Sequence, residues 1–98
     1  MLEKQIEKKV CDHARSLGFL VYKFTSPQRA AVPDRLLISP NGFVFFIEFK
    51  ACGKRPTPAQ VREHVRLKTN KAIIHVIDNV DAGNQLIESY VADLSWMS

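Results

Sequence analysis

The sequence has little of what several common kinds of site require. Its 98 residues include only two cysteines, Cys11 and Cys52, and their spacing is not that of a zinc site. The chain shows no signal peptide and no apolar run long enough to span a membrane, so we expect reduced thiols, a cytoplasmic location and no membrane contact. No motif places a Ser or Cys nucleophile beside a histidine, and we expect surface or core roles for the three histidines.

No repeat, low-complexity tract or linker divides the chain. Its length therefore predicts a single domain over residues 1–98, with one hydrophobic core and a size that gains from a partner chain. Lys and Arg number 14 against 10 Asp and Glu, which gives a formal net charge of +4. This excess of positive charge favours phosphate-bearing partners.

Hydrophobic periodicity predicts an α/β chain with the order helix, three strands, helix, strand, helix. The first helix carries an apolar stripe and ends at Gly18, and the second begins with Thr57 as N-cap and Gln60 as its capping-box partner. The expected ranges are helix 2–17, strands 19–24, 35–38 and 43–50, helix 57–69, strand 72–77 and helix 81–94. For Trp96 we expect a role in capping the core or a dimer contact.

Ionisable residues stand at the ends of otherwise apolar strands. Glu48 and Lys50 share one strand face, since strand side chains alternate. A three-residue loop at 40–42 sets Asp34 opposite Glu48, and a divalent cation would relieve the repulsion between the two carboxylates. A two-residue turn at 41–42 would instead send Asp34 to the other face. The hairpin alone leaves both registers open, and an ordinary surface ion cluster is the alternative to a site.

Three short motifs carry a resemblance to a known superfamily. They are Val32-Pro33-Asp34 at the start of one strand, Ile47-Glu48-Phe49-Lys50 at the end of the next, and Pro58-Ala59-Gln60 at a helix start, preceded by a Glu on the first helix. In this order they resemble the PD-(D/E)XK nucleases, most closely the stand-alone VRR-Nuc domains of phages and bacteria. The resemblance covers nearly the whole chain. It implies a restriction-endonuclease-like αβββαβ core, with a mixed sheet flanked by helices, and metal-dependent phosphodiester hydrolysis.

The resemblance also implies a role for each matching residue. Asp34, Glu48 and the backbone carbonyl of Phe49 would hold Mg²⁺ or Mn²⁺, because oxygen ligands and retained waters suit these ions. Lys50 would orient or help deprotonate the attacking water and offset negative charge in the transition state. Gln60 would bind a phosphate or the water, although its capping role is a sufficient explanation.

A carboxylate from the first helix completes the implied site. Glu3 and Glu7 lie four residues apart on one helical face, so either could lean into it. We prefer Glu7, which stands eleven residues before Gly18-Phe19, as the helix Glu does in similar archaeal Holliday-junction resolvases. The alternative is a solvated face on which both carboxylates pair with neighbouring lysines.

The substrate follows from charge and from the resemblance together. We expect Arg29, Lys54 and Arg55 to contact the DNA backbone. A domain of this size has no separate module for reading bases, so it suits recognition of branched DNA by shape. The resemblance implies a homodimeric resolvase of four-way junctions, and three helices are too few to cover both sheet faces, which leaves apolar surface for a dimer. A flap or replication-intermediate nuclease and a catalytically silent nucleic-acid-binding module are the alternatives.

Overall fold

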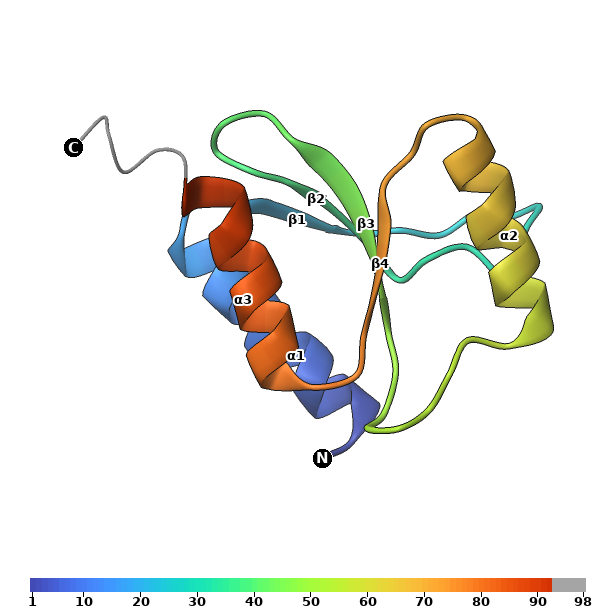
Figure 1. The fold of residues 1–98 in the computed structure, drawn as a ribbon, viewed down its shortest axis with the longest axis horizontal. Coiled ribbons are helices and arrows are strands. Elements are labelled where there is room, and N and C mark those ends of the chain that lie inside the picture. Colours follow the sequence, from blue (N-terminus) through green and yellow to red (C-terminus); the bar gives the residue numbers. More distant parts are fainter. Residues whose placement is uncertain (93–98) are drawn as a thin grey trace.

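The computed structural model describes residues 1–92, which form four strands and three helices (Figure 1). The helices are α1 (Glu3–Ser16), α2 (Pro58–Thr69) and α3 (Val80–Val91), and the strands are β1 (Leu20–Lys23), β2 (Arg35–Ile38), β3 (Val44–Phe49) and β4 (Ile74–Ile77). The predicted element order and α/β class are confirmed. The predicted end of the last helix at Leu94, and Trp96, lie outside the described residues. No helix within 1–92 is both long and apolar enough to cross a bilayer.

The four strands form one mixed sheet in the order β1-β2-β3-β4, antiparallel except for the parallel pair β3 and β4. In the hairpin between β2 and β3, Ile38 pairs with Val44, and the Ser39 N–H donates to the Phe43 carbonyl at 2.8 Å. This is the register of a three-residue loop. Of the two registers that the sequence allows, the chain therefore adopts the one that sets Asp34 opposite Glu48.

One face of the sheet packs against α1 and α3, which lie side by side in Figure 1. Phe45, Ile47 and Phe49 alternate along β3 toward this face and are fully buried. The two helices come closest at Gly83 of α3, because a Cβ at that position would collide with the side chain of Val10 on α1. The glycine thus permits the helix pair to close over the core.

The opposite face is covered only in part, by α2. Within α2 the buried side chains are polar, Glu63 and His64, whereas Val61 and Val65 are exposed. The prediction that strand 43–50 is covered on both faces is wrong at its beginning, where Phe43 and Val44 are 48% and 50% exposed. Val44 is exposed because α2 reaches only the far end of β3 on that face, and Phe43, on the other face, contacts only the end of α3, at Tyr90, within the described residues. Beyond that beginning the strand is buried, apart from half-buried Phe46.

Candidate active site

Four elements bring their ends together at one edge of the sheet. Because β2 and β3 are antiparallel, the start of β2 lies beside the end of β3. The first turn of α1 lies near the same edge (Figure 1), and the first turn of α2 reaches it through Gln60, which contacts Glu48 at the end of β3. The predicted residues Asp34, Glu48, Lys50 and Gln60 are therefore brought to one place, although they are spread over 27 positions of the sequence.

Two backbone N–H groups hold Asp34, one at its side chain and one at its carbonyl oxygen. The N–H of Phe49 donates to Asp34 Oδ2 at 2.7 Å, and the N–H of Phe24 donates to the Asp34 carbonyl at 2.9 Å. The side chain of Asp34 thus stands across the ladder from Glu48, which is only 1% exposed. Two carboxylates face each other at the border of a dry core.

Three side chains surround the carboxylate of Glu48. Gln60 Nε2 donates to Glu48 Oε2 at 3.2 Å, and Lys50 Nζ lies 3.8 Å from the same oxygen. His64 Nε2 lies 3.6 Å from the other oxygen, Oε1, which is too far for a hydrogen bond. Neither Oε1 nor His64 Nε2 has a hydrogen-bond partner within residues 1–92, although both atoms are buried. A buried acceptor of this kind lacks the partner that buried polar groups normally have, and a further ligand would supply it.

The electrostatics of Glu48 favour a ligand of positive charge. Burial, reinforced by the negative charge of Asp34 and opposed by Lys50, raises the pKa of Glu48 to about 8. Without a cation the pair therefore keeps a proton at neutral pH. A bound divalent cation would stabilise both carboxylates in their charged form.

The donor set favours a hard cation. The described part of the chain contains no cluster of three or more His, Cys, Asp and Glu side chains arranged around a metal. Asp34 and Glu48 thus offer carboxylate oxygens alone, which fits an ion such as Mg²⁺ that keeps several of its waters. Contribution of the Phe49 carbonyl stays a prediction.

Both predicted roles of Gln60 involve the same side chain. Its Oε1 accepts from the Thr57 N–H at 2.9 Å, and its own N–H donates to Thr57 Oγ1 at 3.2 Å, so the capping box is confirmed. Its Nε2 points the other way, to Glu48. The cap therefore fixes the amide that contacts the candidate metal ligand.

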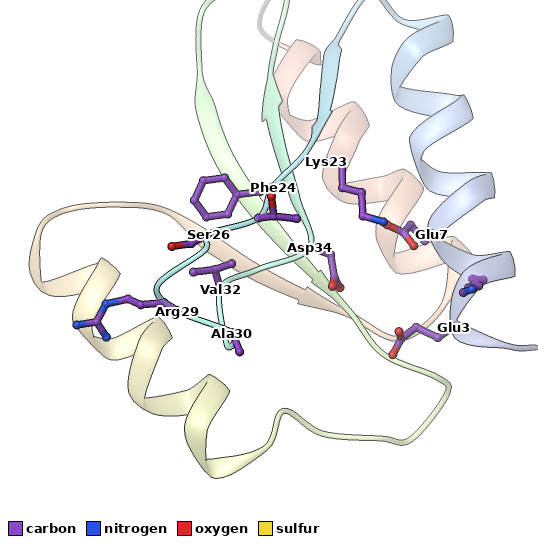
Figure 2. Close-up of a pocket in the computed structure, with 11 residues that line it drawn as sticks. Glu3, Glu7, Lys23, Phe24, Ser26, Arg29, Ala30, Val32 and Asp34 are labelled. Atoms are coloured by element: carbon purple, nitrogen blue, oxygen red, sulfur yellow. The ribbon is translucent and has the colours of Figure 1, made fainter.

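Both helix carboxylates line a cleft of about 450 Å³ together with Asp34. Figure 2 shows Glu3 and Glu7 extending from α1 toward this cleft. Glu7 is not solvated beside lysines, the alternative to a place in the site, because Arg35 Nε donates to its Oε2 at 2.7 Å. The negative charge of Glu3 contributes to the raised pKa of Glu48.

The predicted DNA-binding residues lie in two places. Arg29 lines the same cleft as Asp34, on the loop between β1 and β2 (Figure 2). Lys54 and Arg55 line a separate hollow beside β4, with Val76 among its walls. The structure thus brings Arg29, and not the other two, to the cleft that holds the carboxylates.

His64 is a site residue that reasoning from the sequence missed. It follows Gln60 by four positions, so both side chains share one face of α2 and reach the two oxygens of Glu48. That spacing was the available signal. The other two histidines lie elsewhere, His13 against Glu88 and His75 against Tyr90.

Comparisons with known proteins also indicate a nuclease. The chain is 45% identical over 84 residues to "Putative nuclease p44" of Acyrthosiphon pisum secondary endosymbiont phage 1, a match that covers 86% of this chain and 90% of the phage protein. A solved structure described as "VRR_NUC domain" superposes with a TM-score of 0.81 at 34% identity, covering 90% of this chain and 96% of that one. No family model matches the chain.

Proposed function

The chain belongs to the VRR-Nuc family of nucleases, and on this premise we propose that it is a Mg²⁺- or Mn²⁺-dependent endonuclease that cuts four-way DNA junctions as a homodimer. One observation carries the proposal. Asp34 and Glu48 face each other at the end of the sheet, and the buried Oε1 of Glu48 has no hydrogen-bond partner within residues 1–92. The nuclease assignment follows from the family, and the metal, substrate and assembly are our inference.

Asp34 and Glu48 are the metal ligands of this proposal, with the Phe49 carbonyl as a third oxygen. When bound, a divalent cation polarises a phosphoryl oxygen and lowers the pKa of a coordinated water. The protein fixes the two carboxylates: the Phe49 N–H holds Asp34 at 2.7 Å, and Gln60 Nε2 holds Glu48 at 3.2 Å.

Lys50 supplies the positive charge beside these ligands. Its side chain is 13% exposed and its Nζ lies 3.8 Å from Glu48 Oε2, so the ammonium is held at the site by burial and by ion pairing. From there it orients or helps to deprotonate the attacking water and offsets charge that develops on the phosphoryl group. Gln60 acts beside it, on the same water or on a phosphate oxygen.

Glu7 is our choice for the carboxylate from α1, with Glu3 as the alternative. Arg35 fixes the Glu7 side chain at the cleft, whereas Glu3 has no ion pair within the described residues. Glu7→Gln and Glu3→Gln, assayed side by side, separate the two: the larger loss of cleavage rate identifies the participating carboxylate.

We assign DNA binding to basic residues in two places. Arg29 lies in the carboxylate cleft, and Lys54 and Arg55 lie on the loop that leads from β3 to α2. Contacts of this kind go to backbone phosphates, which position the protein without reading sequence. Recognition of a branched shape is consistent with such contacts.

Homodimerisation is supported by apolar surface on the sheet. Leu20, Tyr22 and Val44 are 52%, 51% and 50% exposed, and the strand register places them on the face opposite α1 and α3. Exposed apolar patches of this kind mark interaction sites. A second copy is the occupant we propose, because resolving a four-way junction takes two symmetric cuts and one chain has one site.

A panel of DNA substrates tests the proposal. Purified protein is incubated with four-way, flap, duplex and single-stranded DNA, each with Mg²⁺, Mn²⁺ or EDTA. We expect paired cuts in the four-way junction that require metal. Preferred cutting of flaps would indicate a nuclease of flaps or replication intermediates instead. Absence of metal-stimulated cleavage on every substrate would contradict the proposal that the protein is a metal-dependent nuclease.

A further inference from the structure

A second hollow, of about 380 Å³, lies between α2 and the loop that joins β1 to β2. Three arginines line it, Arg29 from the loop and Arg62 and Arg66 from α2. The one carboxylate in its wall is Glu63. Three guanidinium groups against one carboxylate leave the hollow with an excess of two positive charges.

The carboxylate of Glu63 orients two of these arginines. It is 6% exposed, and its Oε1 lies 3.2 Å from Arg29 Nη1 and 3.9 Å from Arg66 Nε. A buried carboxylate between two guanidinium groups holds them at the wall of the hollow, although both remain about half exposed on the other side. Arginines fixed in this way lose less freedom when they bind a phosphate.

Arg62 has no such partner. Within residues 1–92 it makes no side-chain hydrogen bond or ion pair, and it is exposed. It precedes Arg66 by four residues, so the two side chains lie on one face of α2, about 6 Å apart along the axis. This distance lies between one and two nucleotide steps measured along the axis of a DNA duplex, at about 3.4 Å per step.

The hollow adjoins the carboxylate cleft. Arg29 and Ala30 line both the carboxylate cleft and this hollow. Figure 2 shows Arg29 reaching from the loop toward α2. Gln60, which contacts Glu48, belongs to the same helix but leaves it on a different face from Arg62, so Arg29 and Ala30 make the connection between the two places. A strand whose phosphate lies at Asp34 and Glu48 can therefore run on into the hollow.

We propose that this hollow binds backbone phosphates of the cleaved DNA strand beside the scissile phosphate, with Arg62 and Arg66 as the contacting residues. The inference rests on the proposed function and specifies how that function holds its substrate. Guanidinium groups suit this ligand because they can bind phosphate oxygens in pairs. A purely structural role, in which Glu63 and Arg29 tie the loop to α2, gives no function to the unpaired Arg62.

Arg62→Ala is the most informative variant, because it leaves no buried charge without a partner. The matched control is Lys68→Ala, which removes the same charge from the same helix at a residue that does not line the hollow. Circular dichroism melting verifies folding of both. Fluorescence anisotropy then measures four-way junction affinity in EDTA over a series of salt concentrations.

We expect Arg62→Ala to weaken binding about tenfold, the effect of one hydrogen bond to a charged group. We also expect its salt dependence to fall by about 0.9 in logarithmic slope, the contribution of one phosphate. The double variant Arg62→Ala/Arg66→Lys keeps the positive charge at position 66. It should therefore show the same loss of slope as Arg62→Ala alone. Lys68→Ala should match wild type in slope.

Neutral methylphosphonate linkages locate the contact. Substitution of the phosphate that Arg62 binds should weaken wild type and leave Arg62→Ala unaffected, while the other positions weaken both equally. If wild type cuts the junction but Arg62→Ala matches Lys68→Ala in affinity, slope and methylphosphonate pattern, the hollow is not a phosphate subsite. If wild type cuts nothing, the proposed function has failed instead.

Discussion

Removing the charge of Asp34 should stabilise the metal-free protein and weaken its stabilisation by a divalent cation. Asp34→Asn retains an oxygen that can accept from the Phe49 N–H, as Asp34 Oδ2 does at 2.7 Å, but abolishes the repulsion with Glu48. We expect the variant to be more stable than wild type in EDTA at pH 8. In Mg²⁺ or Mn²⁺ we expect the reverse order, since wild type gains binding energy and the variant loses a ligand.

The magnitude follows from the pKa of Glu48, which burial and Asp34 raise from 4.5 to about 8. A carboxyl group with a raised folded-state pKa binds more protons folded than unfolded between these values, so metal-free stability falls as pH rises from 4.5 to 8 and is then constant. Each pKa unit corresponds to about 1.4 kcal/mol. The fall is therefore on the order of a few kcal/mol, and it should be smaller in Asp34→Asn.

Urea denaturation at several pH values, with EDTA or with Mn²⁺, measures both effects. Asp12→Asn is the control. Asp12 is an exposed carboxylate on α1 that pairs with Lys8, and it shares no ion-pair partner with Glu48 within the described residues. It should respond to Mn²⁺ as wild type does. Equal stabilisation of wild type and Asp34→Asn by Mn²⁺ would refute the assignment of Asp34 as a ligand.

Three further predictions concern chemistry, packing and assembly. Lys50→Ala should slow cleavage at least about 10²-fold and leave junction affinity within a few-fold, as single-turnover kinetics and anisotropy can check; near-normal cleavage would reduce Lys50 to an ion-pair partner of Glu48. Gly83→Ala should destabilise the fold by about 1–3 kcal/mol in urea denaturation, because the new Cβ collides with Val10; an unchanged midpoint would contradict the close helix contact. Val44→Lys should convert a dimer into an 11 kDa monomer in sedimentation equilibrium at micromolar concentration, and a monomeric wild type, with and without junction DNA, would contradict the dimer itself.

Local signals in the sequence were sufficient for the elements and for part of the site. Thr57 and Gln60 predict the start of α2 as a capping box, and the structure contains this capping box. The register of the hairpin was not decided locally, since both loop lengths are compatible with Asn41 and Gly42. Packing decides it, because the observed register places Leu37 opposite Phe45 on the buried face, whereas a slip of one residue would turn Leu37 to the other face.

Contacts between distant elements could not be predicted from the sequence. The partner of Glu7 is Arg35 on β2, not a neighbouring lysine, because the long Arg35 side chain reaches from the start of that strand to the N-terminal half of α1. The hollow at Arg62 depends on the path of loop 24–34, which has no regular periodicity to predict it. His64 faces Glu48 only because α2 lies over the end of β3.

Glu48→Gln provides the most direct test of the central claim, that Asp34 and Glu48 together form the metal site of a phosphodiester hydrolase. The substitution keeps the size of the side chain and an oxygen for Gln60, but removes the charge that a cation requires. The measurement is single-turnover cleavage of a four-way junction in Mg²⁺, with junction affinity determined in parallel. We predict metal-dependent cleavage by wild type, and no cleavage by Glu48→Gln at unchanged affinity. Cleavage by wild type in EDTA, or by Glu48→Gln at the wild-type rate, would contradict the account.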